Sequence, residues 1–113
     1  MGQPVMVNIV VIENSGKEQQ IKCIPDHLWL IDIRDEVDIK FKLNAHGFKF
    51  PKSAKDAIEI ENNDGQFDKF VRTADEEITV LDYNEGRQWY RYNVTVERED
   101  GSLIKTDPLI INK

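Results

Sequence analysis

The sequence predicts an all-β protein, an antiparallel β-sandwich of about seven strands built from one domain that spans residues 1–113. Three observations lead to this prediction. Apolar and polar residues alternate with period two in several segments, as expected for strands with one buried face. Turn-forming Asn, Asp, Gly and Pro separate these segments. No long segment has helical periodicity, so the pattern indicates two packed sheets.

The clearest alternation lies in residues 36–43, where every second residue is apolar and every other one is charged. A strand directs successive side chains to opposite faces, so one face of this segment enters the core. Its four apolar residues are Val37, Ile39, Phe41 and Leu43.

The other strands of the first half follow in order. Residues 5–13 form the first strand, whose inward face carries Val5, Val7, Ile9 and Val11. A turn at 13–17 leads into a strand at 19–24, and Pro25-Asp26 separates that strand from a short apolar one at 28–33.

The second half repeats the pattern. Strands are expected at 57–61, 66–72 and 77–83, after a single helical turn at 53–57. The most regular strand covers 88–97. Its inward face holds Tyr90, Tyr92, Val94 and Val96.

The last strand, 103–111, is interrupted by Asp107-Pro108, which marks an edge, a bulge or a crossing between sheets because proline cannot donate to a ladder. The aromatic residues Trp29, Trp89, Tyr90 and Tyr92 are expected in the core or in cross-strand pairs.

Charge and composition restrict the partners. With 15 basic and 21 acidic residues, the net charge is −6, which disfavours nucleic acid and anionic membranes as partners. No apolar run approaches the roughly 20 residues of a membrane span. One cysteine, Cys23, allows no internal disulfide, and the start lacks a signal-peptide pattern, so a cytoplasmic location is expected.

No metal site, cofactor or catalytic centre is predicted. Cys23 and His27 supply two ligands, which do not complete a zinc site, so we expect a buried thiol and a surface histidine. Residues 61–68 gather oxygen ligands around Gly65, but a tight turn needs the same residues. No serine or cysteine lies in a nucleophile context and no glycine-rich phosphate loop exists, so the protein is predicted not to be an enzyme.

The segment 44–55 differs from the rest of this acidic chain because it concentrates lysines and aromatic residues. One interpretation is a recognition loop for an acidic partner, with binding residues His46, Phe48, Lys49, Phe50 and Lys52. The other interpretation is that the two phenylalanines close the end of the core while the lysines keep the segment soluble. We favour the second interpretation, since aromatic residues of small domains mostly point inward.

The last two thirds of the chain resemble a known family. Four motifs are similar to the DP-EP family of small uncharacterised bacterial proteins. They are Phe48-Lys49-Phe50-Pro51, Ala57-Ile58, residues 90–94, and Thr106-Asp107-Pro108 with the apolar run to Asn112. The resemblance implies an immunoglobulin-like β-sandwich and a bacterial source. It implies no activity, cofactor or site residue. A cupredoxin-like strand order is the alternative topology.

Together these features predict a non-catalytic protein-interaction or structural module of a bacterial cell, either a monomer or a homodimer. Regularly alternating edge strands are the expected contact elements. The alternative is a small-ligand or ion-binding sandwich in which the loops 44–55 and 62–68 converge at one end.

Overall fold

The computed structural model describes residues 3–13, 19–25, 27–30, 33, 35–63, 65–85, 89–106 and 109–112. These residues form eleven strands and one helical turn. In chain order the elements are β1 (Gln3–Glu13), β2 (Gln19–Ile24), β3 (His27–Leu30), β4 (Val37–Leu43), β5 (Phe48–Lys49), α1 (Ala54–Ala57), β6 (Ile58–Ile60), β7 (Phe67–Ala74), β8 (Glu77–Asp82), β9 (Trp89–Arg98), β10 (Leu103–Thr106) and β11 (Leu109–Asn112).

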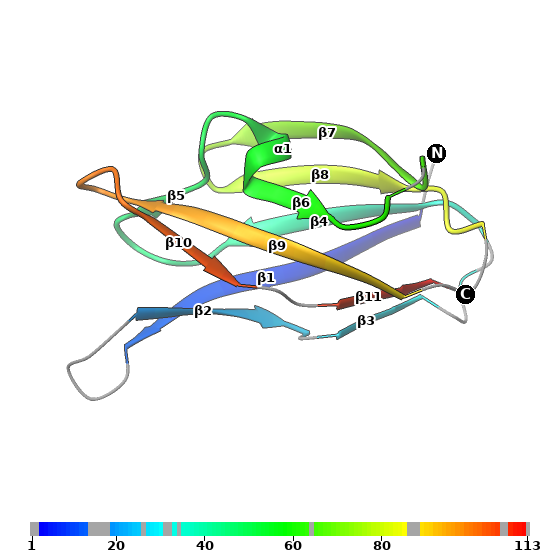
Figure 1. Cartoon of the computed structure of the whole chain (residues 1–113), viewed down its shortest axis with the longest axis horizontal. Coiled ribbons are helices and arrows are strands. Elements are labelled where there is room, and N and C mark those ends of the chain that lie inside the picture. The colour runs from blue at the N-terminus through cyan, green and yellow to red at the C-terminus, as the bar shows by residue number, and fades with distance from the viewer. Residues whose placement is uncertain are drawn as a thin grey trace.

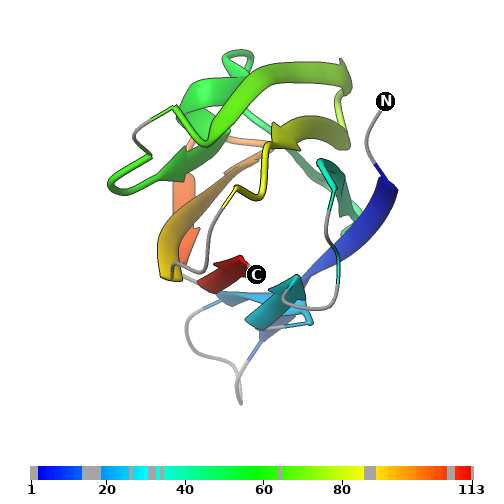
Figure 2. The same cartoon turned by 90° about the vertical axis from the view of Figure 1, so that its right-hand side faces the viewer.

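The strands form two sheets, which confirms the predicted all-β sandwich. A five-stranded sheet has the order β2-β1-β4-β8-β7. A six-stranded sheet has the order β10-β9-β11-β3, and the short strands β5 and β6 also pair with β9. In Figure 1 the strand β9 of the six-stranded sheet crosses in front of β1 and β4 of the five-stranded sheet, and Figure 2 shows the strands of both sheets arranged around a common centre.

The core contains the residues that the alternation selects. The four apolar residues of β4 are at most 1% exposed, and the inward face of β9 is buried along the whole strand. Two aromatic pairs join the sheets across the core. The rings of Phe41 and Tyr92 have centroids 5.5 Å apart, and those of Phe67 and Tyr90 meet edge to face at 4.9 Å. Such tilted pairs are favourable beyond the area they bury.

The sheets are mixed rather than wholly antiparallel. β1 pairs antiparallel with β2 but parallel with β4, and β11 pairs parallel with β3. The chain crosses from one sheet to the other between β2 and β3 and then returns at β4 to the free side of β1. Because β4 arrives after this crossing rather than through a hairpin, it runs in the same direction as β1.

The crossing therefore lies between Ile24 and His27. Asp107 and Pro108, one predicted place for it, lie outside the described residues. The strands on either side of them, β10 and β11, belong to the same sheet because both pair with β9. The predicted single strand at 103–111 is thus two strands along one edge of β9.

The strand count exceeds the expected number of about seven. Each of the nine segments expected as strands contains one, the segment 103–111 is divided into β10 and β11, and β5 falls in a predicted loop. β5 pairs Phe48 and Lys49 with the far end of β9. The predicted helical turn is confirmed as α1, in which the Ser53 carbonyl accepts from the N–H groups of Asp56 and Ala57, both at 3.1 Å. This turn packs its buried Ala57 next to β6, β7 and β9.

Candidate functional site

The segment 44–55 contributes its aromatic residues to the core. Phe50 is fully buried, and Phe48 is partly buried against the core cluster. The Phe50 N–H donates to the Asp75 carbonyl at 2.8 Å, and Arg72 Nη2 donates to the Phe50 carbonyl at 3.1 Å. These bonds hold the segment against β7, so Phe50 offers no surface to a partner.

The polar residues of this segment lie on the surface. His46, Lys49 and Lys52 are exposed. Lys49 pairs in register with Glu97, beside a shallow pocket of about 360 Å³ whose lining includes Asp75, Glu76, Glu97 and Glu99. Four carboxylate side chains thus line the same pocket as this lysine, and their negative charge reduces its attraction for an acidic partner. Binding by His46, Lys49 and Lys52 stays a prediction.

The two loops of the ligand-binding alternative do not converge. Phe48 pairs with Arg98 at one end of β9, whereas the Glu61 N–H donates to the Arg91 carbonyl, at 2.9 Å, near the other end. Seven residues of extended strand separate these points, about 23 Å. Figure 1 shows β5 and the turn after β6 at opposite ends of the molecule. The prediction of a shared site was wrong because β9 is long and each loop pairs with a different end of it.

The turn at 61–68 is held by its own side chains. Asn63 Oδ1 accepts from the Phe67 N–H at 2.8 Å, and Asn63 Nδ2 donates to the Phe67 carbonyl at 3.2 Å. The Asp68 carboxylate accepts from the Tyr83 hydroxyl at 3.3 Å. Loss of hydration and the nearby Asp68 carboxylate raise the pKa of Tyr83. Asp64 lies outside the described residues.

The residues considered for a metal site are not clustered. Cys23 is buried and His27 is exposed, as expected for a core thiol and a surface histidine. Within the described ranges, no group of three or more His, Cys, Asp or Glu side chains is arranged to hold a metal ion.

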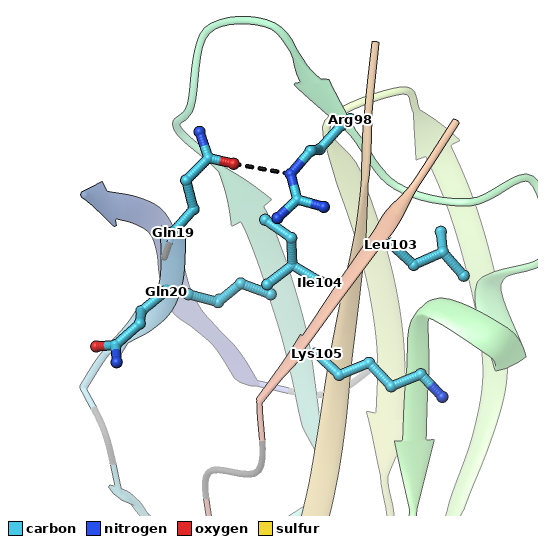
Figure 3. A pocket seen from close by; sticks show the side chains of 7 residues that line it. Gln19, Gln20, Arg98, Leu103, Ile104 and Lys105 are labelled. Carbon is cyan, nitrogen blue, oxygen red and sulfur yellow. Dashed lines mark hydrogen bonds between the residues drawn. The ribbon is translucent and has the colours of Figure 1, made fainter. Parts of the chain in front are cut away.

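A groove of about 690 Å³ follows the seam where β2 and β10 approach each other. Arg98 Nε donates to Gln19 Oε1 at 2.8 Å across this seam, and Arg98 Nη1 donates to Ser102 Oγ at 2.9 Å. Figure 3 shows Gln19 and Arg98 reaching toward each other while Leu103 and Lys105 point to the other side of β10. The hydrogen bonds of the Arg98 guanidinium therefore stabilise the contact between the two sheets.

The outer face of the six-stranded sheet carries the two tryptophans of the chain, which we call the indole pair, Trp29 and Trp89. Their side chains are 60% and 64% exposed. Buried Leu28, Leu30 and Tyr90 flank them in sequence, so both indoles point away from the core. These tryptophans were expected in the core or in cross-strand pairs. The core location was wrong because each side chain lies on the outward-facing side of its strand, where both residues are register partners of Ile111.

The register brings the two indoles close together. Ile111 of β11 is the partner of Trp29 on one side and of Trp89 on the other. The tryptophans are therefore two strands apart on one row, a spacing of about 9–10 Å. Figure 1 shows β3, β11 and β9 side by side in this order. Sequence positions 29 and 89 give no indication of this proximity.

Polar side chains flank the indole pair. His27 and Arg91 are exposed and pair with the two sides of Leu109, one row from the tryptophans. Beside Trp89, a small pocket of about 240 Å³ is lined by Glu61, Asn62 and Arg91. This site therefore combines two flat aromatic surfaces with hydrogen-bond donors and acceptors.

No family model matches the chain, and no curated protein matches it. In the part of the chain that the structure describes, no helix has the length and apolar character needed to cross a bilayer.

Proposed function

We propose that the protein is a non-catalytic binding module whose recognition surface is the indole pair on the outer face of the six-stranded sheet. The observation that carries this proposal is the exposure of Trp29 and Trp89 on one row of that face. Tryptophan is one of the residues enriched among the side chains that dominate binding energy. The exposure of two neighbouring tryptophans to water favours a role in binding another molecule.

The exposed area is large enough to support binding. A tryptophan side chain buries about 150–250 Å² when it is covered, so the exposed fractions leave roughly 200–300 Å² available on the pair. Removing this area from water contributes about 5–8 kcal/mol before the cost of association. The cost of association takes much of this gain, which points to a moderate affinity.

A non-catalytic role agrees with the chemistry around the pair. The described side chains that flank it are His27, Arg91, Glu61 and Asn62, and none of these carries a hydroxyl or thiol nucleophile. Arg91 and Glu61 are suited to hold hydroxyl, amide or carbonyl groups.

Origin and partners are proposed on sequence grounds. A reducing, cytoplasmic location is proposed from the single cysteine. A bacterial source and membership of the DP-EP family are proposed from the motifs of the last two thirds of the chain. The net charge of −6 disfavours nucleic acid as the partner. From the sequence alone, a protein partner or a second copy of the chain was expected, whereas the polar groups beside the indole pair also suit a non-protein ligand.

The proposal is tested by retention of cellular components on the immobilised full-length protein. The parent is compared with the double variant Trp29→Ala/Trp89→Ala and with a matched control, Val71→Ala/Leu103→Ala, which shortens two exposed apolar side chains elsewhere. Circular dichroism establishes that all three proteins fold.

We expect the parent and the control to retain the same cellular component, whether or not it is a protein. The double variant Trp29→Ala/Trp89→Ala should not retain this component. Equal retention by all three proteins, or no retention by the parent above bare resin, would overturn the proposal.

A further inference from the structure

We infer that the indole pair binds a neutral, linear oligosaccharide, with one sugar ring stacked on each indole. This inference rests on the proposed function and names the class of ligand that the same site takes. The observations behind it are the spacing of the two indoles, the polar groups beside them and the charge of the site.

The spacing fits sugars two residues apart in a chain. The indoles are separated by two strand spacings, about 9–10 Å, which is close to the length of a disaccharide unit. In an extended chain of the cellulose type, alternate rings are turned over, so rings two residues apart present the same face to the same side. Two aromatic surfaces on one face of a sheet match that repeat.

The chemistry of stacking is favourable. The face of an aromatic ring carries negative charge density, whereas the C–H groups on the flat face of a pyranose carry a partial positive charge. Both indoles are more than half exposed, so a ring can reach each of them without moving the core.

The polar groups suit sugar hydroxyls. A hydroxyl both donates and accepts, and it needs partners of both kinds. Beside Trp89, Arg91 supplies donors, Glu61 supplies acceptors and Asn62 supplies both. The hydrogen bond from the Glu61 N–H to the Arg91 carbonyl, at 2.9 Å, fixes this corner of the site next to the indole.

Other occupants fit less well. Single-stranded nucleic acid also stacks on aromatic side chains, but it requires a positive groove, and here Arg91 is accompanied by Glu61 in a protein of net charge −6. At a protein interface, energetically dominant residues sit in a desolvated centre. The indole pair is instead flanked by His27, Arg91 and Glu61, which such a contact would strip of water.

The test uses the fluorescence of the full-length protein. Because Trp29 and Trp89 are its only tryptophans, all tryptophan emission comes from the proposed site. The probes are cellohexaose, chitohexaose and mannohexaose, with the corresponding disaccharides and a thymidine hexanucleotide for comparison. Calorimetry on the same samples measures binding independently of the optical signal.

We expect a saturable change in emission with at least one hexasaccharide, with weaker binding of its disaccharide and no response to the oligonucleotide. Trp29→Ala and Trp89→Ala should each weaken binding by about tenfold or more, and the remaining tryptophan still reports it. The control Val71→Ala/Leu103→Ala should bind as the parent does.

The absence of binding to all three hexasaccharides at millimolar concentration overturns the inference, as does tighter binding of the oligonucleotide. If the resin experiment shows tryptophan-dependent retention of a protein while no sugar binds, the proposed function stands and the saccharide assignment fails.

Discussion

Replacing Asn84 tests how the end of β8 is fastened to the segment before β4. Asn84 is fully buried, and its side chain donates to the Ile33 carbonyl at 2.8 Å and to the Asp35 carbonyl at 3.3 Å. Its φ of 54° lies in the left-handed region, which asparagine tolerates better than alanine. The same residue thus provides both a tie between distant segments and an unusual backbone conformation.

The two contributions can be estimated separately. Asn84→Ala leaves carbonyl oxygens without their donor, which costs about 1–3 kcal/mol. It also places a residue with a Cβ in the left-handed region, for roughly 1 kcal/mol more. Asn84→Gly loses the hydrogen bonds but adopts the backbone conformation without strain. We therefore expect the parent to be the most stable protein, followed by the glycine variant and then the alanine variant.

The free energy of unfolding is measured by urea titration with far-UV circular dichroism. Tryptophan emission is a poor reporter for this purpose because both indoles are already exposed in the folded protein. We expect the alanine variant to lose about 2–4 kcal/mol. A loss below about 0.5 kcal/mol, the scatter of ordinary surface substitutions, would refute this account of the tie, and an alanine variant more stable than the glycine variant would refute the backbone argument.

Three further predictions concern the opposite end of the molecule. Phe50→Ala should lower the free energy of unfolding by about 3–5 kcal/mol because Phe50 is fully buried. Lys49→Ala should change it by less than about 0.5 kcal/mol. Equal effects of the two substitutions in urea titration would contradict the role of Phe50 in closing the end of the core. Two hydrogen bonds from Ser102 lower the pKa of Asp100, so this contribution to stability is present above the unfolded-state pKa and is lost as pH falls through the lower folded-state value. Ser102→Ala should therefore raise the pKa of Asp100 toward its ordinary value in a carboxyl NMR titration, and an unchanged pKa would contradict this cause. Gly47→Ala should destabilise the protein by about 1–2 kcal/mol, because φ of Gly47 is +83° and the new Cβ would lie 3.3 Å from a Glu99 carboxylate oxygen. The midpoint of thermal unfolding measures this loss, and an unchanged midpoint would show that the turn accepts the Cβ without strain.

The sequence predicted the inward faces of the strands well because burial imposes period two directly on the residues. β4 and β9 show this most clearly, since every residue expected inside is buried. The same rule assigns Trp89 to the outside, opposite Tyr90, although aromatic residues of small domains are mostly buried. The position of a residue in the alternating pattern was a better guide to its burial than the type of residue.

The arrangement of the strands was less accessible from sequence. Nothing local distinguishes β3, which continues directly after β2, from a strand of the same sheet, although it crosses to the other one. The indole pair depends on this crossing, because it brings residue 29 within two strands of residue 89. When the pairing of strands brings distant residues together, as it does for Trp29 and Trp89, the sequence contains no motif of fixed spacing that would reveal the site.

The pairing of β3 with β11 has a consequence for how the chain is made. Among the described strands, β3 has β11 as its only neighbour in the sheet, and the paired residues His27 and Leu109 are 82 positions apart. At about 5–20 residues per second, a ribosome needs roughly 4–16 s to produce that partner after β3 has been synthesised. During this interval Trp29 and its strand have no place in a sheet, so nascent chains are most exposed to association with one another before β11 emerges. Slowing translation after β3 should lengthen this vulnerable period and lower the yield of folded protein.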